Sequence, residues 1–271
     1  MTAYTLNRFS DSYFLNAPSG ITLATNDTLL VKNGALVGSE NGDGVLVQGD
    51  NTTTTNDGRI AGGAANNNYG FDFEDFSAGS LTNDLGASII AGTGVFVGAG
   101  IKAMVNHGDI SGFHLAGIHT DEQVVSWSLT NDGTIYGYAD GIFDFGGAAA
   151  VTNTGNGLIQ SDTYGFELDA NTATITNDLH ATISGTLDSI YTHESGSLIL
   201  NNFSTLVDDV LCTVAAANNS IFNQGTINGN VIFAAGNATH LAACFAIDDA
   251  QGEIGLLRLF APETGPPTSV N

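Results

Sequence analysis

The sequence predicts an all-β chain that folds as one right-handed parallel β-helix of about ten rungs, each about 24 residues long. Three observations predict this fold. A degenerate motif recurs at a regular spacing, short stretches of alternating apolar residues lie between its copies, and helical periodicity is absent from a chain rich in glycine. A fixed repeat period is typical of solenoids, in which each repeat closes its core by stacking on its neighbours.

The motif consists of an apolar residue, Thr, Asn, a glycine-containing turn and then Ile or Leu, as in Leu129–Ile135. Alternation along a strand directs this Asn to the same side as the apolar residue two positions earlier, which is the core side. Asn side chains stacked at about 4.8 Å can hydrogen-bond amide to amide. We therefore predict a structural ladder, with Asp248 as a tenth member, made of Asn33, Asn56, Asn83, Asn106, Asn131, Asn153, Asn177, Asn202 and Asn223.

A second stretch in each repeat starts with glycine and continues with alternating apolar residues, as in Gly44-Val45-Leu46-Val47. Its inward positions are apolar in most repeats, but Asp144 falls in this column. A register slip is the explanation we expect, because Phe145 follows, and burial of Asp144 with a partner is the alternative. A third short strand carries the Ile or Leu that follows the turn.

The repeats predict a single domain, because no linker interrupts them and all four prolines lie near the ends. We assign residues 1–24 to an N-terminal cap, 25–256 to the β-helix and 257–271 to a C-terminal tail. Aromatic residues near the N-terminus would cover the first edge strands.

Five basic residues against 28 acidic ones give a net charge of −23. This charge opposes binding to nucleic acid or to anionic membranes, and it is compatible with divalent cations. No apolar run reaches the length of a membrane span, so we expect no membrane insertion, and no cleavable signal is visible. If the protein is exported, we expect a route without such a signal.

The Thr-Asn-x-Gly-x-Ile-x-Gly rung resembles the passenger-type β-helices of autotransporter and type I-secreted adhesins of bacteria. The resemblance covers roughly Thr25 to Leu256 and implies a bacterial extracellular or cell-surface location and a structural or adhesive role. The segment Asn230–Thr239 also resembles a calcium-binding nonapeptide repeat, but Ala238 stands where that family needs a carboxylate. No cofactor is required by this interpretation, and calcium is a candidate ligand.

An enzymatic alternative is a carbohydrate-active β-helix that binds or hydrolyses a polysaccharide, which needs two carboxylates on one outward face. The candidates are Glu167 and Asp169, with Asp144 or His119 as a third group. We predict no metal site, because the histidines of the rung that contains His119 match no zinc spacing.

The outward positions of the second stretch form a column in which most residues are large and apolar. A continuous apolar stripe on a rod predicts an interface, with the same protein or with a surface glycan or protein. The interface residues that we predict are Leu46, Phe96, Phe143, Tyr191, Leu211 and Ile232. The main prediction is thus a non-enzymatic adhesive module. Rows of Thr-x-Thr on another face resemble the rows of ice-binding solenoids. Ice binding is therefore a third interpretation of the function.

Overall fold

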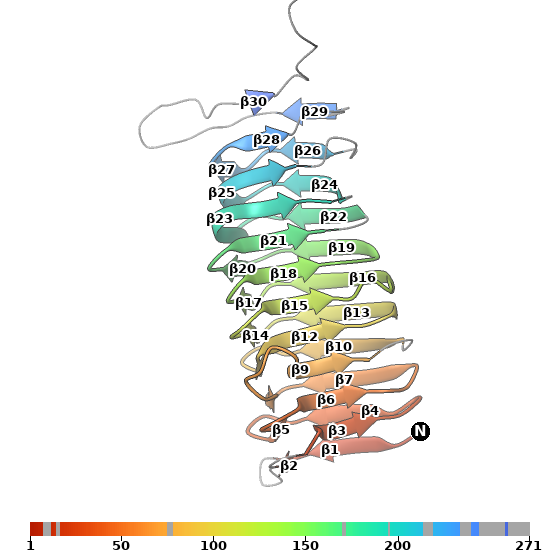
Figure 1. Ribbon diagram of the computed structural model, residues 1–271. Coiled ribbons are helices and arrows are strands. Elements are labelled where there is room, and N and C mark those ends of the chain that lie inside the picture. The colour runs from red at the N-terminus through yellow and green to blue at the C-terminus, as the bar shows by residue number, and fades with distance from the viewer. Residues whose placement is uncertain are drawn as a thin grey trace, which may run out of the picture.

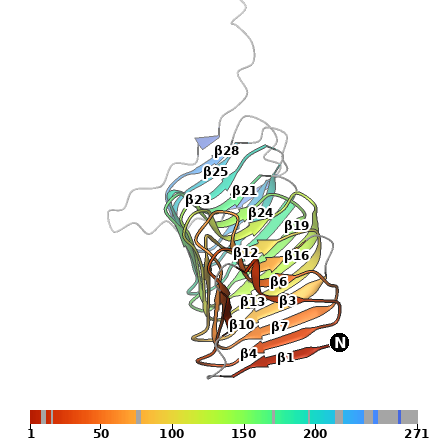
Figure 2. The same cartoon turned by 60° about the horizontal axis from the view of Figure 1, so that its bottom comes forward.

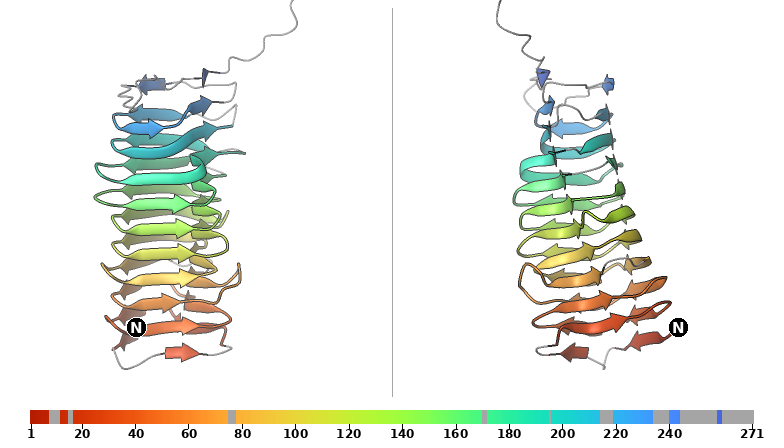
Figure 3. Two further views of the ribbon diagram at one scale, coloured as in Figure 1. Left: turned by 90° about the vertical axis from the view of Figure 1, so that its left-hand side faces the viewer. Right: turned by 45° about the vertical axis from the view of Figure 1, so that its right-hand side comes forward.

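The computed structural model describes residues 1–7, 12–14, 17–74, 78–169, 172–194, 196–213, 219–233, 240–243 and 258–259. These residues form a right-handed parallel β-helix, as the repeats predict, and contain no helix (Figure 1). Figure 3 shows the successive rungs stacked along one axis, with the N-terminal rung at one end. No helix among the described residues is long and apolar enough to span a bilayer.

The Thr-Asn strands, one from each rung, pair in parallel as an eleven-stranded sheet. Thr and other β-branched residues favour such strands, and most of the strands end where a turn with Gly or Asp begins. The strands are β1 (Ala3–Leu6), β4 (Thr28–Val31), β7 (Thr52–Asn56), β10 (Gly79–Asn83), β13 (Gly100–Asn106), β16 (Val124–Asn131), β19 (Ala148–Asn153), β22 (Thr172–Asn177), β24 (Ser197–Asn202), β26 (Ser220–Asn223) and β29 (His240–Ala243).

The other two strands of each rung belong to one nineteen-stranded sheet that faces the first sheet across the core (Figure 2). The strands that follow the turn are β2 (Ser12–Phe14), β5 (Leu36–Ser39), β8 (Arg59–Ala61), β11 (Ser88–Ala91), β14 (Asp109–Gly112), β17 (Thr134–Gly137), β20 (Leu158–Ser161) and β27 (Thr226–Asn228). The glycine-led strands are β3 (Ser19–Leu23), β6 (Asp43–Val47), β9 (Tyr69–Phe73), β12 (Thr93–Val97), β15 (Ala116–Thr120), β18 (Asp140–Asp144), β21 (Tyr164–Leu168), β28 (Val231–Phe233) and β30 (Arg258–Leu259). The longer β23 (Thr182–Thr192) and β25 (Thr205–Cys212) contribute to both columns.

The glycine at the start of most glycine-led strands allows close packing against the Ile side chains of the strands that follow the turn. A Cβ on Gly141 would lie 2.5 Å from the Gly165 carbonyl oxygen and 2.8 Å from Ile159 Cγ2. The same arrangement recurs at Gly94, where Ile110 is the neighbour. The repeated Gly in the sequence therefore reports a backbone approach that a larger residue would block.

The stack of parallel strands begins before Thr25, where the sequence analysis placed the boundary between cap and β-helix. Ala3 of β1 pairs in register with Thr28 of β4, and Ile21 of β3 pairs with Val45 of β6. Part of residues 1–24 is thus the first rung itself. Beyond residue 243, only Arg258–Leu259 is described, so the predicted ladder member Asp248 and most of the tail lie outside the described residues.

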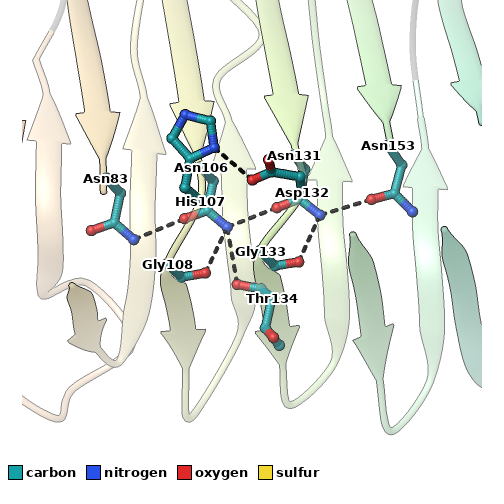
Figure 4. Close-up of polar contacts among 9 residues, drawn as sticks. All are labelled: Asn83, Asn106, His107, Gly108, Asn131, Asp132, Gly133, Thr134 and Asn153. Carbon is teal, nitrogen blue, oxygen red and sulfur yellow. Dashed lines mark hydrogen bonds and ion pairs between the residues drawn. The ribbon is translucent and has the colours of Figure 1, made fainter. Parts of the chain in front are cut away.

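A continuous asparagine ladder runs through the core on the Thr-Asn side (Figure 4). Each Nδ2 donates to the Oδ1 of the next Asn, over distances of 2.6–3.0 Å and with sequence separations of 21–27 residues. The second amide hydrogen is donated to a backbone carbonyl, as from Asn131 to Gly133 at 3.2 Å. The members are Asn56, Asn83, Asn106, Asn131, Asn153, Asn177, Asn202 and Asn223.

The predicted ladder position of Asn33 is wrong. Val31, two residues earlier, pairs with Asn56, while Asn33 is exposed in the following turn. The first Asn of the ladder therefore has no amide beneath it, and Asn56 Oδ1 accepts from the Gly58 backbone instead, at 3.2 Å. The alignment erred because Asn is common both in the ladder and in turns.

The predicted register slip at Asp144 is also wrong. Thr120, Asp144 and Leu168 follow one another in unbroken register, and the Asp144 side chain is fully buried. Its Oδ1 accepts hydrogen bonds from Thr120 Oγ1 at 2.8 Å and from Trp127 Nε1 at 3.0 Å, while no hydrogen bond reaches its Oδ2. Burial raises the pKa of Asp144 to about 7.

Candidate functional site

The outward side chains of the glycine-led strands form a continuous column along the described part of the rod. We call it the outward column. Its members follow one another in register along the rod, from β6 to β28. All are half-buried except Asp72, which is buried. In order they are Leu46, Asp72, Phe96, His119, Phe143, Glu167, Tyr191, Leu211 and Ile232.

Aromatic side chains of this column stack on one another and on rings beside it. In the first aromatic stack, Tyr69 lies 4.7 Å from Phe96, centroid to centroid, and His119 lies 5.1 Å from Phe143. The Phe96 and His119 rings, 5.6 Å apart, join these two pairs edge to face. Burial lowers the pKa of His119 to about 4, so the ring is neutral at pH 7. The stacked geometry covers ring faces and stabilises the rod.

The second aromatic stack lies beside a group of carboxylates. Tyr191 lies between Tyr164, at 4.6 Å and 26°, and His193, at 5.1 Å and 16°. Glu167 occupies the column position one rung before Tyr191. The two stacks therefore flank an acidic region on the outward side of β18, β21 and β23.

Asp140 and Glu167 form a carboxyl pair in this region. Burial, followed by the charge and the side chain of the neighbouring Glu167, raises the pKa of Asp140. A carboxyl group with a raised pKa beside a second carboxyl group is an arrangement that general acid and general base chemistry uses. Glu167 Oε1 also lies 2.7 Å from His193 Nε2.

Asp169 and His193 occupy equivalent places in adjacent rungs, each directly after the last inward residue of a glycine-led strand or its equivalent, Leu168 or Thr192. The alignment of Leu168 with Thr192 brings them together, and His193 Nδ1 lies 3.3 Å from Asp169 Oδ1. Asp169 is 4% exposed, and burial raises the pKa of its carboxyl. The Glu194 carboxylate lies beside both.

The candidate residues of the enzymatic alternative divide between two sides of the sheet. Glu167 and Asp169 do belong to one cluster, which His193 joins, whereas Asp144 points into the core and contributes to no outward site. His119 belongs to the first aromatic stack.

Sequence reasoning missed His193 and Glu194. The signal was available, because His193 follows the inward Thr192 just as Asp169 follows Leu168, one repeat earlier.

The other candidate surfaces are less complete. The outward Thr rows of the first sheet are in register, but Ala103 and Val105 interrupt them. In the segment that resembles a calcium repeat, Asn230 bonds the Asp209 carboxylate through its backbone N at 2.6 Å, and residues 234–239 lie outside the described part.

The fold and this surface define the class of the protein. It is a parallel β-helix with an aromatic and acidic outward face. Comparison with family models, curated proteins and solved structures finds no match to this chain.

Proposed function

We propose that the chain is a rigid, non-enzymatic binding rod of the secreted or cell-surface kind, which associates with further copies of itself through the outward column. The half-buried aromatic side chains that follow this column along the rod carry the proposal. A bacterial origin and an adhesive role follow from the resemblance to passenger-type β-helices. A surface glycan or protein is the alternative partner.

The stacked rings favour a protein surface over a sugar as the occupant. Sugar rings bind to exposed aromatic faces, but neighbouring rings cover one face of Phe143 and two faces of Tyr191. The half-buried rings form an ordered apolar ridge, and prior order lowers the conformational entropy lost on binding. A second copy of the rod offers a matching ridge.

The net charge of the chain makes this association depend on ionic strength and on divalent cations. Each copy carries a net charge of −23, so two copies repel each other at low ionic strength. Glu167 lies half-buried within the outward column, where a divalent cation can bridge carboxylates of two copies. We therefore expect association to increase with calcium or with salt.

Replacement of Phe143 and Tyr191 by Ser should abolish association. Light scattering with and without calcium should give oligomers for the natural chain and monomers for this double variant, because the variant lacks two central rings of the ridge. Ile199→Ser is the matched control, since Ile199 is 39% exposed on the first sheet, away from the outward column. Unfolding curves identify any loss of fold. A natural chain that stays monomeric in both conditions would refute self-association.

A second function, hydrolysis of a polysaccharide, is favoured by the carboxyl pair of Asp140 and Glu167 alone. A screen of polysaccharides for new reducing ends tests it. If the pair is the acid and base, Glu167→Gln should lower the rate roughly 100- to 10,000-fold, while Asp162→Asn, at an exposed carboxylate nearby, should leave it unchanged. Equal rates for the natural chain and Glu167→Gln would exclude this pair as the catalytic groups.

A further inference from the structure

Three potential metal ligands meet at the corner of the rod that follows β21 and β23. His193 Nδ1 or Nε2, an Asp169 carboxylate oxygen and a Glu194 carboxylate oxygen lie within 4.8 Å of one another. The parallel register creates this cluster, because Asp169 and His193 occupy equivalent positions in adjacent rungs. Glu194 is exposed, has a φ of 54° and follows His193 directly.

Asp169 is the buried member of the cluster, and one of its carboxylate oxygens lacks a hydrogen bond. Its side chain is 5% exposed, and no hydrogen bond reaches its buried Oδ1. The nearest ring nitrogen to that oxygen is His193 Nδ1, 3.3 Å away. A buried carboxylate oxygen without a donor costs free energy, which a bound cation would offset.

The contacts of His193 orient one of its nitrogens toward Asp169. Nε2 lies 2.7 Å from Glu167 Oε1, so in the neutral ring the proton is on Nε2 and the lone pair is on Nδ1. That lone pair faces Asp169 Oδ1, another electron-pair donor. A carboxylate that holds the far nitrogen of a histidine is the usual outer partner of a metal-bound imidazole.

The separation of the two donor atoms fits a small metal ion. Zinc binds His nitrogen and carboxylate oxygen at about 2.0–2.2 Å, which separates two ligands of a tetrahedron by roughly 3.3–3.5 Å. The observed separation between His193 Nδ1 and Asp169 Oδ1 is 3.3 Å.

We propose that His193 Nδ1, Asp169 Oδ1 and a Glu194 carboxylate oxygen bind one divalent transition metal ion of the zinc class, with Glu167 as the outer partner of the imidazole. The imidazole selects zinc-class ions over calcium and magnesium, which prefer oxygen ligands alone. Three protein ligands leave a fourth position for water or a ligand. This site does not depend on the proposed self-association.

The experiment is calorimetric titration of the metal-free full chain with zinc chloride and, separately, with calcium chloride. We expect one zinc ion per chain, bound more tightly than calcium. Glu194→Gln and Asp169→Asn should each abolish or strongly weaken zinc binding, and Glu167→Gln should weaken it roughly 10- to 100-fold. Cobalt absorption provides a second readout of imidazole and carboxylate coordination.

His107→Ala is the matched control, because His107 also pairs with a carboxylate, Asp132 at 2.6 Å, outside the cluster. It should leave zinc affinity unchanged, and Glu194→Gln should retain the fold because Glu194 is exposed. Equal zinc affinity in the natural chain and in Glu194→Gln, or tighter binding of calcium than of zinc, would overturn the proposal. Absence of zinc binding by the natural chain would overturn it as well.

Discussion

Replacement of Asn131 by Asp should lower the free energy of unfolding by about 3–5 kcal/mol at pH 7, the range for an uncompensated buried charge. Asn131 Nδ2 donates to Asn153 Oδ1 at 2.8 Å and to the Gly133 carbonyl at 3.2 Å (Figure 4). An Asp oxygen at that place would face two acceptors inside a core that excludes water. Chemical denaturation of both proteins measures the difference.

Two comparisons make this result specific to the ladder. Protonation restores one donor, so the loss should be smaller at pH 4 than at pH 7. Asn33→Asp makes the same chemical change outside the ladder, on an exposed residue, and should alter stability by less than about 0.5 kcal/mol. Equal losses for the two variants would mean that the inward amides contribute no more than a surface Asn.

Replacement of Asp144 by Asn should stabilise the protein at pH 8 by at most about 4 kcal/mol, the full value of a pKa raised from 3.8 to about 7. The raised pKa means that the folded state holds a proton that the unfolded state has lost between about pH 4 and pH 7. The contribution of Asp144 to stability is therefore complete below pH 4 and falls as the pH rises through 7. Asn keeps the acceptor for Thr120 and Trp127 without the charge.

The measurement is denaturation of both proteins from pH 4 to pH 8 in the presence of EDTA. The difference in stability should grow across this range, since other carboxylates act equally in both proteins. Trp127 is the single tryptophan of the chain, so its fluorescence should also titrate in the natural protein and not in Asp144→Asn. Asp162→Asn, at an exposed position, is the control. A difference that is constant from pH 4 to pH 8 would show that Asp144 is not protonated in this range.

Periodicity predicted most of the fold because a solenoid repeats the same local problem in every rung. Gly141 and Ile159 recur in equivalent places for a steric reason that each rung meets again. Single departures were harder to interpret. Asn33 matched the motif by composition but lies in a turn, and Asp144 broke the pattern without breaking the register.

The candidate site was only partly predictable, because part of it depends on the alignment of residues across two rungs. Glu167 and Asp169 were identified as two carboxylates close together in one rung, whereas His193 carried no motif of its own. Its role depends on one alignment across rungs and on two contacts, with Glu167 and with Asp169. No spacing along a single repeat contains that information.

The sequence by itself determined that the chain is a parallel β-helix and that an Asn column lies inside it. It also determined which side chains form the outward column of the glycine-led strands. Period and alternation fix these features, because stacked rungs place equivalent residues above one another. Only the tertiary structure decided that Asp144 is buried with Thr120 and Trp127, and that His193 meets Asp169. Those outcomes depend on ångström-scale distances and on burial between rungs, which the spacing of residues along the chain does not specify.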